Sequence, residues 1–369
     1  MKFIILQDKL LAGLQSLIGI VPTKSTFPVL ANVLLEVHKD KLRLSATDLE
    51  IAAVTELEAP GAQTGAITVP AKQLFEIVRQ LPHSPVDVSV DENKISIKCD
   101  NSKFSLIGIA KEEFPKIPEI KKDKSFKMAA ATFHGAVRKT LFAVSNDSSR
   151  PALCGAMFQI NGDKLKVVTT DGRRLALFES MITPVSQKSE LLIPPKALGQ
   201  VSRMLGTDEG EITIKFDESY SQYSFQNTQV FARHLEGPYP DYEKVIPWDN
   251  QKVLNMSTEL FAAAVRRVAV FSDTFTSLIR ISAKNDLVEL SSRTADIGEA
   301  FESMPAKFGS DPLDIGYNAT YLLEILKNIE SEEVNLYLNT ALSAGLVKPA
   351  KQKEEYTLVY LLMPIRLPE

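Results

Sequence analysis

An internal repeat is the feature that most limits how this chain can fold. The stretch 69–81 recurs at 193–205 and again at 317–329, so each copy starts 124 residues after the previous one. A second marker, a hairpin-like run of alternating apolar residues, starts at 40, 163 and 286, with steps of 123. Two markers with nearly one period indicate three copies of a single folding unit. In the first copy the apolar residues have the spacing of one helical face: Leu74, Ile77, Val78 and Leu81.

Each copy shows the same order of secondary-structure signals. A helical pattern comes first, over 8–19, 131–146 and 257–271, and strand-like runs and the 69–81 type of helix follow. Alternating strands close each copy at 95–99, 212–216 and 334–338. Alternation favours antiparallel sheets with helices on one face, and therefore an α+β fold. Polar joints at 119–125 and 247–252 predict three similar domains over 1–122, 123–250 and 251–369.

The composition is that of a soluble globular protein. Of the 369 residues, 44% are hydrophobic and 24% are charged. No apolar run approaches the roughly 20 residues of a membrane span, and the amino terminus lacks a signal-peptide pattern. Cys99 and Cys154 are isolated in apolar surroundings, which predicts buried thiols rather than a disulfide or a metal site. We therefore expect a cytoplasmic protein with no membrane contact.

Charge is distributed unevenly between the six predicted helices and the rest of the chain. The helices hold ten basic and four acidic residues, a charge of +6, and the total of −4 then leaves −10 for the remainder. Amphipathic helices ordinarily have charged outer faces, which is the simpler explanation for any single helix. A basic balance over the whole set instead predicts contacts to the phosphates of a polyanion. No recognition helix, zinc finger or RNA-binding motif indicates base-specific contacts.

Enzyme activity has little support in the sequence. His38, His83, His134 and His234 share no metal-ligand spacing with one another or with the cysteines. No phosphate-binding glycine loop or nucleophile elbow is present. The 170–172 stretch looks like a phosphate turn, but Asp-Gly is commoner in hairpins. We predict neither an enzyme nor a bound metal or cofactor, and an unrecognised hydrolase is the less favoured alternative.

Several short motifs in order along the chain carry a family resemblance. Over essentially all 369 residues, the chain resembles the bacterial replicative DNA sliding clamp, the beta subunit of DNA polymerase III. One departure is Phe27, where the family usually has Leu. The motifs are weak singly and specific in this order on a threefold repeat: 26–35, 47–50, 104–106, 170–176, 239–242 and 363–367.

The resemblance implies a fold and a function. Three similar domains per chain would form the DNA clamp fold, and two chains would join head to tail in a ring. Antiparallel sheets would lie outside and two helices per domain would line the hole. Such a homodimer is a processivity factor, which slides on duplex DNA without sequence specificity. Its implied partners are the replicative polymerase alpha subunit, the clamp loader and other proteins with a clamp-binding motif.

Candidate DNA-contacting residues come mainly from the helices. Phosphate contacts position a protein without specifying sequence, so a ring that uses only these contacts can slide. Lys24 and Arg150 lie on loops, and a solvated loop cation is the alternative for each. The full set is Lys24, Lys72, Arg79, Arg138, Lys139, Arg150, Lys196, Arg203, Arg266 and Arg267.

The resemblance also implies an apolar cleft in which partner peptides dock. The sequence supports it in part, because the tail near 361–365 is apolar and contains a proline, which suits an edge strand. The alternative is that these residues are the core of the last strand. The implied cleft residues are Leu153, Thr170, Gly172, Arg173, Arg174, Leu175, Pro240, Lys244, Val245, Leu361, Leu362, Met363, Pro364, Ile365 and Arg366.

The dimer interface implied by the resemblance joins the first domain of one chain to the third of the other. Phe104 would meet Val270 and Phe271, although Phe271 is equally consistent with the end of an amphipathic helix. Across this interface, Lys98 and Lys103 would pair with Glu299 and Glu302. The main alternative function is a repeat scaffold that forms no ring and binds proteins only.

Overall fold

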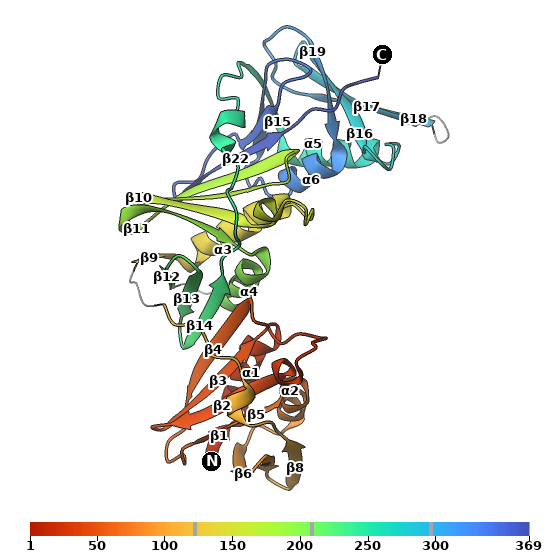
Figure 1. Cartoon of the computed structure of the whole chain (residues 1–369). Coiled ribbons are helices and arrows are strands. Elements are labelled where there is room, and N and C mark those ends of the chain that lie inside the picture. Colours follow the sequence, from red (N-terminus) through yellow and green to blue (C-terminus); the bar gives the residue numbers. More distant parts are fainter. Residues whose placement is uncertain (121–123, 207–209, 295–297, 369) are drawn as a thin grey trace. The chain divides into compact units, whose positions relative to one another are not determined.

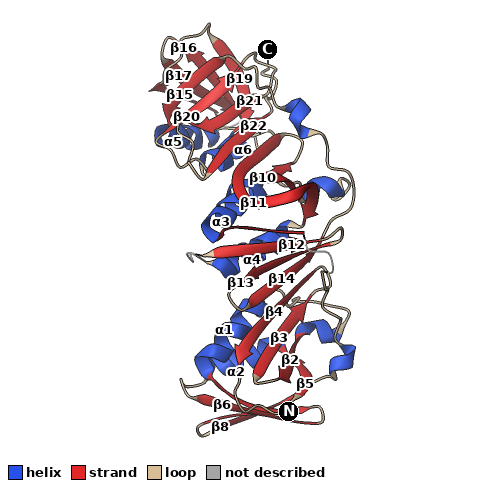
Figure 2. Cartoon of the chain, turned by 90° about the vertical axis from the view of Figure 1, so that its left-hand side faces the viewer, coloured by secondary structure: helices blue, strands red, loops and turns tan. Residues whose placement is uncertain are grey.

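The computed structural model describes residues 1–120, 124–206, 210–294 and 298–368, and its elements form two compact units (Figures 1 and 2). Unit 1 comprises Met1–Ala131 and Lys196–His234, and unit 2 comprises Thr132–Pro195 and Leu235–Glu369. The middle third of the chain therefore contributes to both units. The predicted boundary at residue 122 lies outside the described residues.

Unit 1 contains a four-stranded and an eight-stranded antiparallel sheet, in the orders β1-β6-β7-β8 and β5-β2-β3-β4-β14-β13-β12-β9. Its helices are α1 (Gln7–Ile18), α2 (Ala71–Gln80) and α4 (Pro195–Leu205), with short 3-10 turns at Pro28–Ala31 and Lys111–Glu113. Its strands are β1 (Lys2–Leu6), β2 (Asn32–His38), β3 (Lys41–Thr47), β4 (Ile51–Glu58), β5 (Gly65–Pro70), β6 (Pro85–Asp91), β7 (Lys94–Cys99), β8 (Ser102–Ile107), β9 (Lys124–Ala129), β12 (Glu211–Phe216), β13 (Tyr220–Phe225) and β14 (Thr228–Arg233).

Unit 2 contains a six-stranded and a four-stranded antiparallel sheet, in the orders β10-β11-β22-β21-β20-β15 and β18-β17-β16-β19. Its helices are α3 (Ala130–Thr140), α5 (Thr258–Ala269) and α6 (Ala319–Leu326), with 3-10 turns η3 (Leu141–Ala143), η4 (Pro151–Cys154) and η5 (Tyr242–Val245). Its strands are β10 (Ala156–Thr170), β11 (Arg174–Ile193), β15 (Lys252–Ser257), β16 (Leu278–Lys284), β17 (Leu287–Thr294), β18 (Gly298–Pro305), β19 (Leu313–Asn318), β20 (Glu333–Leu338), β21 (Gly345–Pro349) and β22 (Tyr356–Leu362).

The predicted helical stripes are confirmed as the buried faces of the helices. Leu74 and Val78 of α2 are buried, and so are Leu322 and Ile325 of α6. In unit 1, α1 packs against β3 and β4, and the side chain of Gln7 donates to the carbonyl of Val78 at 2.7 Å. The α+β prediction, with antiparallel sheets and paired helices, is likewise confirmed.

The predicted helix over 131–146 is too long. Helix α3 ends at Thr140, and a separate 3-10 turn follows. The Thr140 hydroxyl donates back to the carbonyl of Ala136 at 2.7 Å, and the Thr140 carbonyl accepts the Thr169 hydroxyl at 2.6 Å. Both bonds compete with the helical pattern, because they occupy the groups that a further turn would use.

Two antiparallel strand pairs join successive thirds of the chain, and we call them strand joints. In unit 1, β14 of the middle third pairs with β4 of the first third, with Val230 opposite Ala53. In unit 2, β22 of the last third pairs with β11 of the middle third, with Tyr360 opposite Ala176. The sheets are therefore continuous across the repeat boundaries.

Candidate functional site

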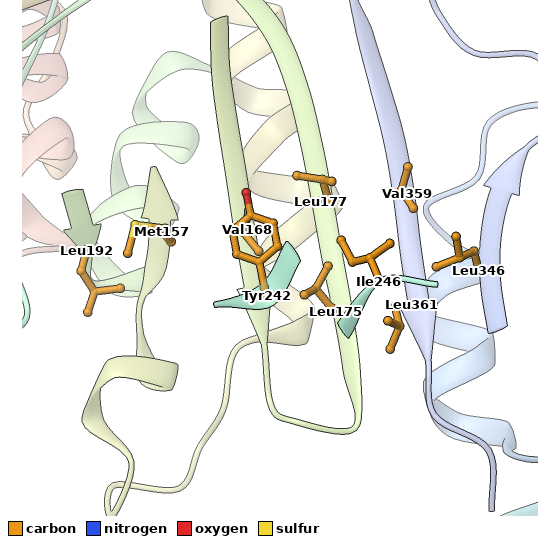
Figure 3. Packing of buried hydrophobic residues seen from close by; sticks show 10 residues of the cluster. All are labelled: Met157, Val168, Leu175, Leu177, Leu192, Tyr242, Ile246, Leu346, Val359 and Leu361. Carbon is orange, nitrogen blue, oxygen red and sulfur yellow. The ribbon is translucent and has the colours of Figure 1, made fainter. Parts of the chain in front are cut away.

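A cluster of buried apolar side chains covers one face of the six-stranded sheet (Figure 3). Alternate residues of the neighbouring strands contribute to it, and Tyr242 and Ile246 cover it from the η5 segment. Leu175 and Leu361, both predicted for the cleft, are only 2% and 3% exposed. The complete cluster is Met157, Val168, Leu175, Leu177, Leu192, Tyr242, Ile246, Leu346, Val359 and Leu361.

Exposed residues lie next to this cluster in the chain and provide its rim. Val245 precedes Ile246 and is 58% exposed, and Met363, two residues after Leu361, is 44% exposed. The Met363 backbone N–H donates to the carbonyl of Arg173 at 2.9 Å, which holds the tail at the turn between β10 and β11. Four further predicted cleft residues are exposed: Gly172, Arg173, Pro240 and Lys244.

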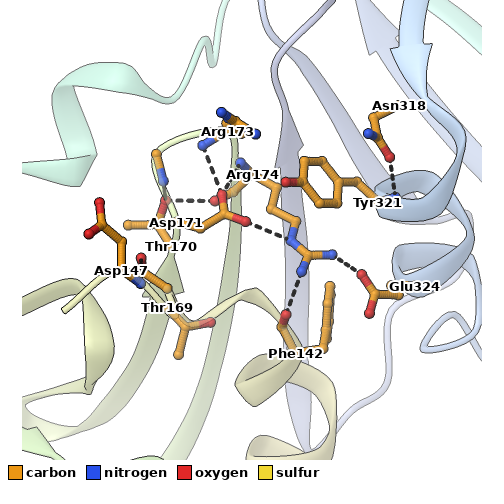
Figure 4. A network of polar contacts seen from close by, with 12 residues as sticks. Phe142, Asp147, Thr169, Thr170, Asp171, Arg173, Arg174, Asn318, Tyr321 and Glu324 are labelled. Carbon is orange, nitrogen blue, oxygen red and sulfur yellow. Dashed lines mark hydrogen bonds and ion pairs between the residues drawn. The ribbon is translucent and has the colours of Figure 1, made fainter. Parts of the chain in front are cut away.

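The turn between β10 and β11 is held by Thr170, Asp171 and Arg174 (Figure 4). The Thr170 hydroxyl donates to the Arg174 carbonyl at 2.6 Å, and Gly172 has a positive φ of 87° that suits its lack of a side chain. The Asp171 carboxylate accepts the backbone N–H groups of Arg173 and Arg174 at 2.8 and 3.0 Å. Thr170 therefore shapes the cleft without contacting a ligand.

The prediction that Arg174 lines the cleft needs correction. Its guanidinium donates to the Phe142 carbonyl at 2.7 Å and also bonds to Asp171 and Glu324. The rings of Tyr321 and Phe142 lie 4.3 and 5.2 Å from it. Successive strand residues face opposite sides of a sheet, so Arg174 points away from Leu175 and ties β11 to α6. Arg174 is therefore a positioning residue.

Two predicted leucines also lie elsewhere than expected. Leu362 is 1% exposed and faces away from Leu361 for the same reason of strand alternation. Leu153 is buried in η4, where the adjacent Ala152 rather than Leu153 packs against the apolar cluster. We therefore remove Leu153, Thr170, Arg174 and Leu362 from the set of side chains that a docked peptide would touch.

The tail beyond Met363 is attached to the second sheet of unit 2. The Ile365 backbone N–H donates to the carbonyl of Gly316 on β19 at 2.8 Å. A Cβ on Gly316 would lie 2.5 Å from the Ile365 oxygen, so only glycine permits this approach. Pro364 and Ile365 are partly buried as a result, and Arg366 is exposed. The tail supports the fold as well as the rim.

Lys139 is buried rather than available to DNA, which corrects its predicted role. Its side chain is 2% exposed, and its ammonium lies 2.8 Å from a Glu330 carboxylate oxygen and 5.5 Å from the centre of the Tyr356 ring. Burial lowers the pKa of Lys139, against the opposing effect of Glu330. Lys139 ties the end of α3 to the segment after α6, and we remove it from the DNA-contacting set.

The other nine predicted DNA contacts are exposed, but five of them already pair with carboxylates. These pairs are Arg79–Glu76, Arg138–Glu330, Arg150–Asp147, Lys196–Asp48 and Arg267–Glu302. Among the described residues, no carboxylate lies within 4.0 Å of the side-chain nitrogens of the remaining four. Those four are Lys24, Lys72, Arg203 and Arg266.

The predicted dimer residues occupy strand edges and a helix end. Phe104 on β8 is 37% exposed, and Val270, just after α5, is 71% exposed. Phe271 lies beside the start of β18, where a Cβ on Gly298 would be 3.6 Å from its ring. Glu302 bonds to Arg267 of its own chain, at 2.9 Å to Nε, so it is not free for Lys98 or Lys103 as predicted.

The sequence prediction missed part of the apolar cluster. Leu346 on β21 and Ile246 after η5 both belong to it, and Leu346 lies opposite Tyr337 in the sheet. Burial alternates weakly along β21, and Ile246 sits in a loop, so neither gave a periodic pattern. Cys99 is buried as predicted, but Cys154 is only partly buried.

Within the described residues, no group of three or more His, Cys, Asp or Glu side chains is arranged to hold a metal ion. None of the helices there is long and apolar enough to span a membrane.

Comparison with known proteins matches the whole chain. Family models for the DNA polymerase III beta subunit match its N-terminal domain at 1–118, its central domain at 127–241 and its C-terminal domain at 243–366. The chain is 31% identical to the beta sliding clamp of Pseudomonas aeruginosa, with 100% of both sequences covered. A crystal structure of the DNA polymerase III subunit beta from that species aligns with a TM-score of 0.94, 30% identity and 100% of both chains covered. A sliding clamp from the same species bound to griselimycin gives the same three values.

Three similar α+β domains, joined by strand pairs and carrying an apolar cluster on one sheet, define the DNA clamp fold. The chain belongs to the bacterial beta sliding clamp family, the beta subunit of DNA polymerase III. This family consists of processivity factors and not of enzymes.

Proposed function

We propose that two copies of this chain form a ring that encircles duplex DNA and tethers the replicative polymerase to it. The observation that carries the proposal is the repetition of the strand joint. Each chain has two such joints, and by the repeat a third would pair β8 of the first third with β18 of the last third. One chain cannot form that joint with itself if it follows the head-to-tail order, but two chains can form it twice.

The free edges of the sheets support this closure. Among the described strands, β8 and β18 are end strands with no pairing on their outer edges. The opposite end strands are partly covered, because β1 bridges to Gln63 and β19 bridges to Ile365. An uncovered edge strand is a ready template for another chain. Phe104 and Phe301, 37% and 66% exposed, place aromatic surface on these two edges.

The two existing joints also predict the register of the third. Val230 opposite Ala53 and Tyr360 opposite Ala176 are equivalent pairs in the repeat. The hairpins β7–β8 and β13–β14 correspond residue by residue, which makes Phe104 the equivalent of Val230. The hairpins β3–β4 and β17–β18 make Ala300 the equivalent of Ala53. In the proposed dimer, Phe104 of one chain therefore faces Ala300 of the other.

DNA would be held through phosphates by the exposed basic side chains. Lys24, Lys72, Arg203 and Arg266 have no carboxylate partner among the described residues, so their charge is available in full. Arg79, Arg138, Arg150, Lys196 and Arg267 would contribute less, because a carboxylate already offsets each charge. Contacts of this kind have no preferred register and permit sliding.

Partner proteins would dock a short peptide against the apolar cluster, between Val245 and Met363. The polymerase alpha subunit, the clamp loader and other proteins with a clamp-binding motif are the proposed partners. The P. aeruginosa clamp bound to griselimycin supports ligand binding by this fold. We further propose a cytoplasmic protein with domain limits near residues 122 and 250.

Retention on DNA tests the proposed ring. Loaded by its ATP-driven loader onto nicked circular duplex, the protein should stay bound in salt that removes ordinary phosphate binders, and cutting the circle should release it. Binding that is lost equally in salt from circular and linear DNA would contradict the ring. It would favour the alternative of a protein-binding scaffold, for which the mass in solution would be that of one chain rather than two.

A further inference from the structure

A lysine held between two aromatic rings forms a distinct surface next to the apolar cluster. The ammonium of Lys348, on β21, lies 4.7 Å from the centre of the Tyr337 ring and 5.1 Å from that of Trp248. Trp248 is the single tryptophan of the chain, and it is 58% exposed. We call Trp248, Tyr337 and Lys348 the aromatic shelf.

The shelf is fixed to the sheet and is continuous with the apolar cluster. Asn250 donates from its side-chain nitrogen to the carbonyls of Tyr337 and Ala344, both at 2.9 Å. Tyr337 and Ala344 themselves pack against the cluster, and Ile246 of the cluster is two residues before Trp248. Lys348 shares a sheet face with Leu346, because alternate strand residues point the same way.

The Lys348 charge has aromatic neighbours but no anionic partner. No described Asp or Glu carboxylate lies within 4.0 Å of its ammonium. Burial lowers the pKa of Lys348, and no carboxylate opposes that effect. Nearby lysines differ, since Lys244 pairs with Asp241 at 2.8 Å and Lys307 pairs with Glu333 at 3.3 Å. A cation over aromatic rings is stabilised, yet it keeps its capacity to bind an anion.

We propose that the aromatic shelf binds an acidic side chain of the docked partner, beside the apolar anchor that enters the cleft. The inference rests on the proposed docking function and deepens it by naming a second subsite and its ligand chemistry. The backbone of the partner crosses the Trp248 ring, and an Asp or Glu carboxylate accepts a hydrogen bond from the Lys348 ammonium. Partial desolvation makes such a pair stronger than one on an open surface.

Peptide pairs test the shelf directly. One series carries a fixed apolar anchor and a single Asp moved along both flanks, and a matched series carries Asn at the same positions. Dissociation constants come from the anisotropy of a labelled peptide, with Trp248 emission as a second signal. At one flank position we expect Asp to bind about tenfold more tightly than Asn, with the difference shrinking as salt rises.

Variants of Lys348 assign that difference. Lys348→Gln keeps much of the side chain that packs on the rings, and it should make the Asp and Asn peptides bind equally. Lys348→Arg should restore the preference. Lys307→Gln, at an exposed lysine whose partner is Glu333, should leave the preference unchanged.

The outcomes separate this inference from the function on which it rests. If both series bind the wild type but show no Asp preference at any position, the shelf proposal is wrong and the docking proposal stands. If neither series binds, the docking proposal fails and the shelf proposal fails with it. If Lys348→Gln lowers retention on circular DNA while the Asp preference persists, the lysine serves DNA and the shelf proposal is overturned.

Discussion

The backbone N–H of Met363 donates to the carbonyl oxygen of Arg173 at 2.9 Å, and this bond extends the β11–β22 pairing past the end of the strand. It fixes a 44% exposed methionine beside the turn that Thr170 and Asp171 hold. The thioether therefore lies at the rim of the apolar cluster with a fixed backbone and a flexible side chain. Such a combination suits a pocket that accepts several different peptides.

Met363→Ala should weaken the binding of clamp-binding peptides by roughly 30-fold. Truncation of a central hot-spot side chain typically costs about 2 kcal/mol or more, which corresponds to that factor. Titration of a labelled peptide against each variant measures it. Met181→Ala is the matched control, because Met181 is 57% exposed on β11 and lies outside the cluster. Equal affinity for wild type and a folded Met363→Ala variant would place the docking site elsewhere.

Glu330→Gln should destabilise the protein at neutral pH and progressively less in acid. Burial alone would raise the pKa of Glu330, but hydrogen bonds and charges from Lys139, Tyr356 and Arg138 lower it to about 2. A lowered carboxyl pKa stabilises the folded state above the ordinary value near 4.3, and that contribution disappears as pH falls toward 2. The lowered pKa of Lys139 has the opposite sense, but only the carboxylate changes charge in this range.

Thermal unfolding between pH 7 and pH 3 measures this effect. Glu330 is 40% exposed, so solvent screening limits the expected loss to about 1–3 kcal/mol at neutral pH. Glu76→Gln is the control, because the Glu76–Arg79 pair is exposed on one helix and should contribute little. A gap between wild type and Glu330→Gln that stays constant down to pH 3 would be incompatible with the ion pair described.

Neutralising unpaired cations should weaken DNA binding more than neutralising paired ones. Lys72→Ala removes a charge with no carboxylate partner, whereas Arg79→Ala, on the same helix, removes one that Glu76 already offsets. We expect Lys72→Ala to reduce the slope of log affinity against log salt by about one on linear duplex, and Arg79→Ala to reduce it less. Salt titrations of the two variants provide the comparison. Identical slopes would show that intrachain pairing does not govern the contact.

The sequence was sufficient for local features and insufficient for long-range partners. The stripe containing Leu74 and Val78 is periodic, so it revealed its helix and its buried face directly. Lys139 sits next to the exposed Arg138, and nothing local distinguishes the two. Its burial depends on Glu330, which lies 191 residues away in the chain. A contact of that kind has no signature in a single sequence.

The error in the cleft has a different origin. Leu175 and Arg174 are adjacent on β11, and Leu361 and Leu362 are adjacent on β22. Neighbours in a strand face opposite sides of its sheet, so only one residue of each pair can line one cleft. Strand alternation could therefore have separated them before the structure was known. The strand joints, in contrast, required the observed pairing.

Closure of the ring through a third strand joint is the central claim, and a cross-link across that joint tests it most directly. The register that places Phe104 opposite Ala300 also places Ser102 opposite Glu302, as Thr228 faces Thr55 in unit 1. The Thr228 and Thr55 hydroxyls are 3.0 Å apart, so side chains at this position meet. Such pairs have Cα atoms within the range that a disulfide needs.

Chains carrying Ser102→Cys and Glu302→Cys, in a background with Cys154→Ser, should oxidise to covalent dimers at protein concentrations where the dimer forms. Chains with Ser102→Cys and Ala300→Cys, displaced by two residues, should cross-link far less, because diagonal strand neighbours lie about 7–8 Å apart. Mass analysis under denaturing conditions reads both results. Efficient covalent dimers from the in-register pair alone are the predicted outcome. Dimers from the displaced pair alone, or from neither pair, would contradict closure of the ring by this joint.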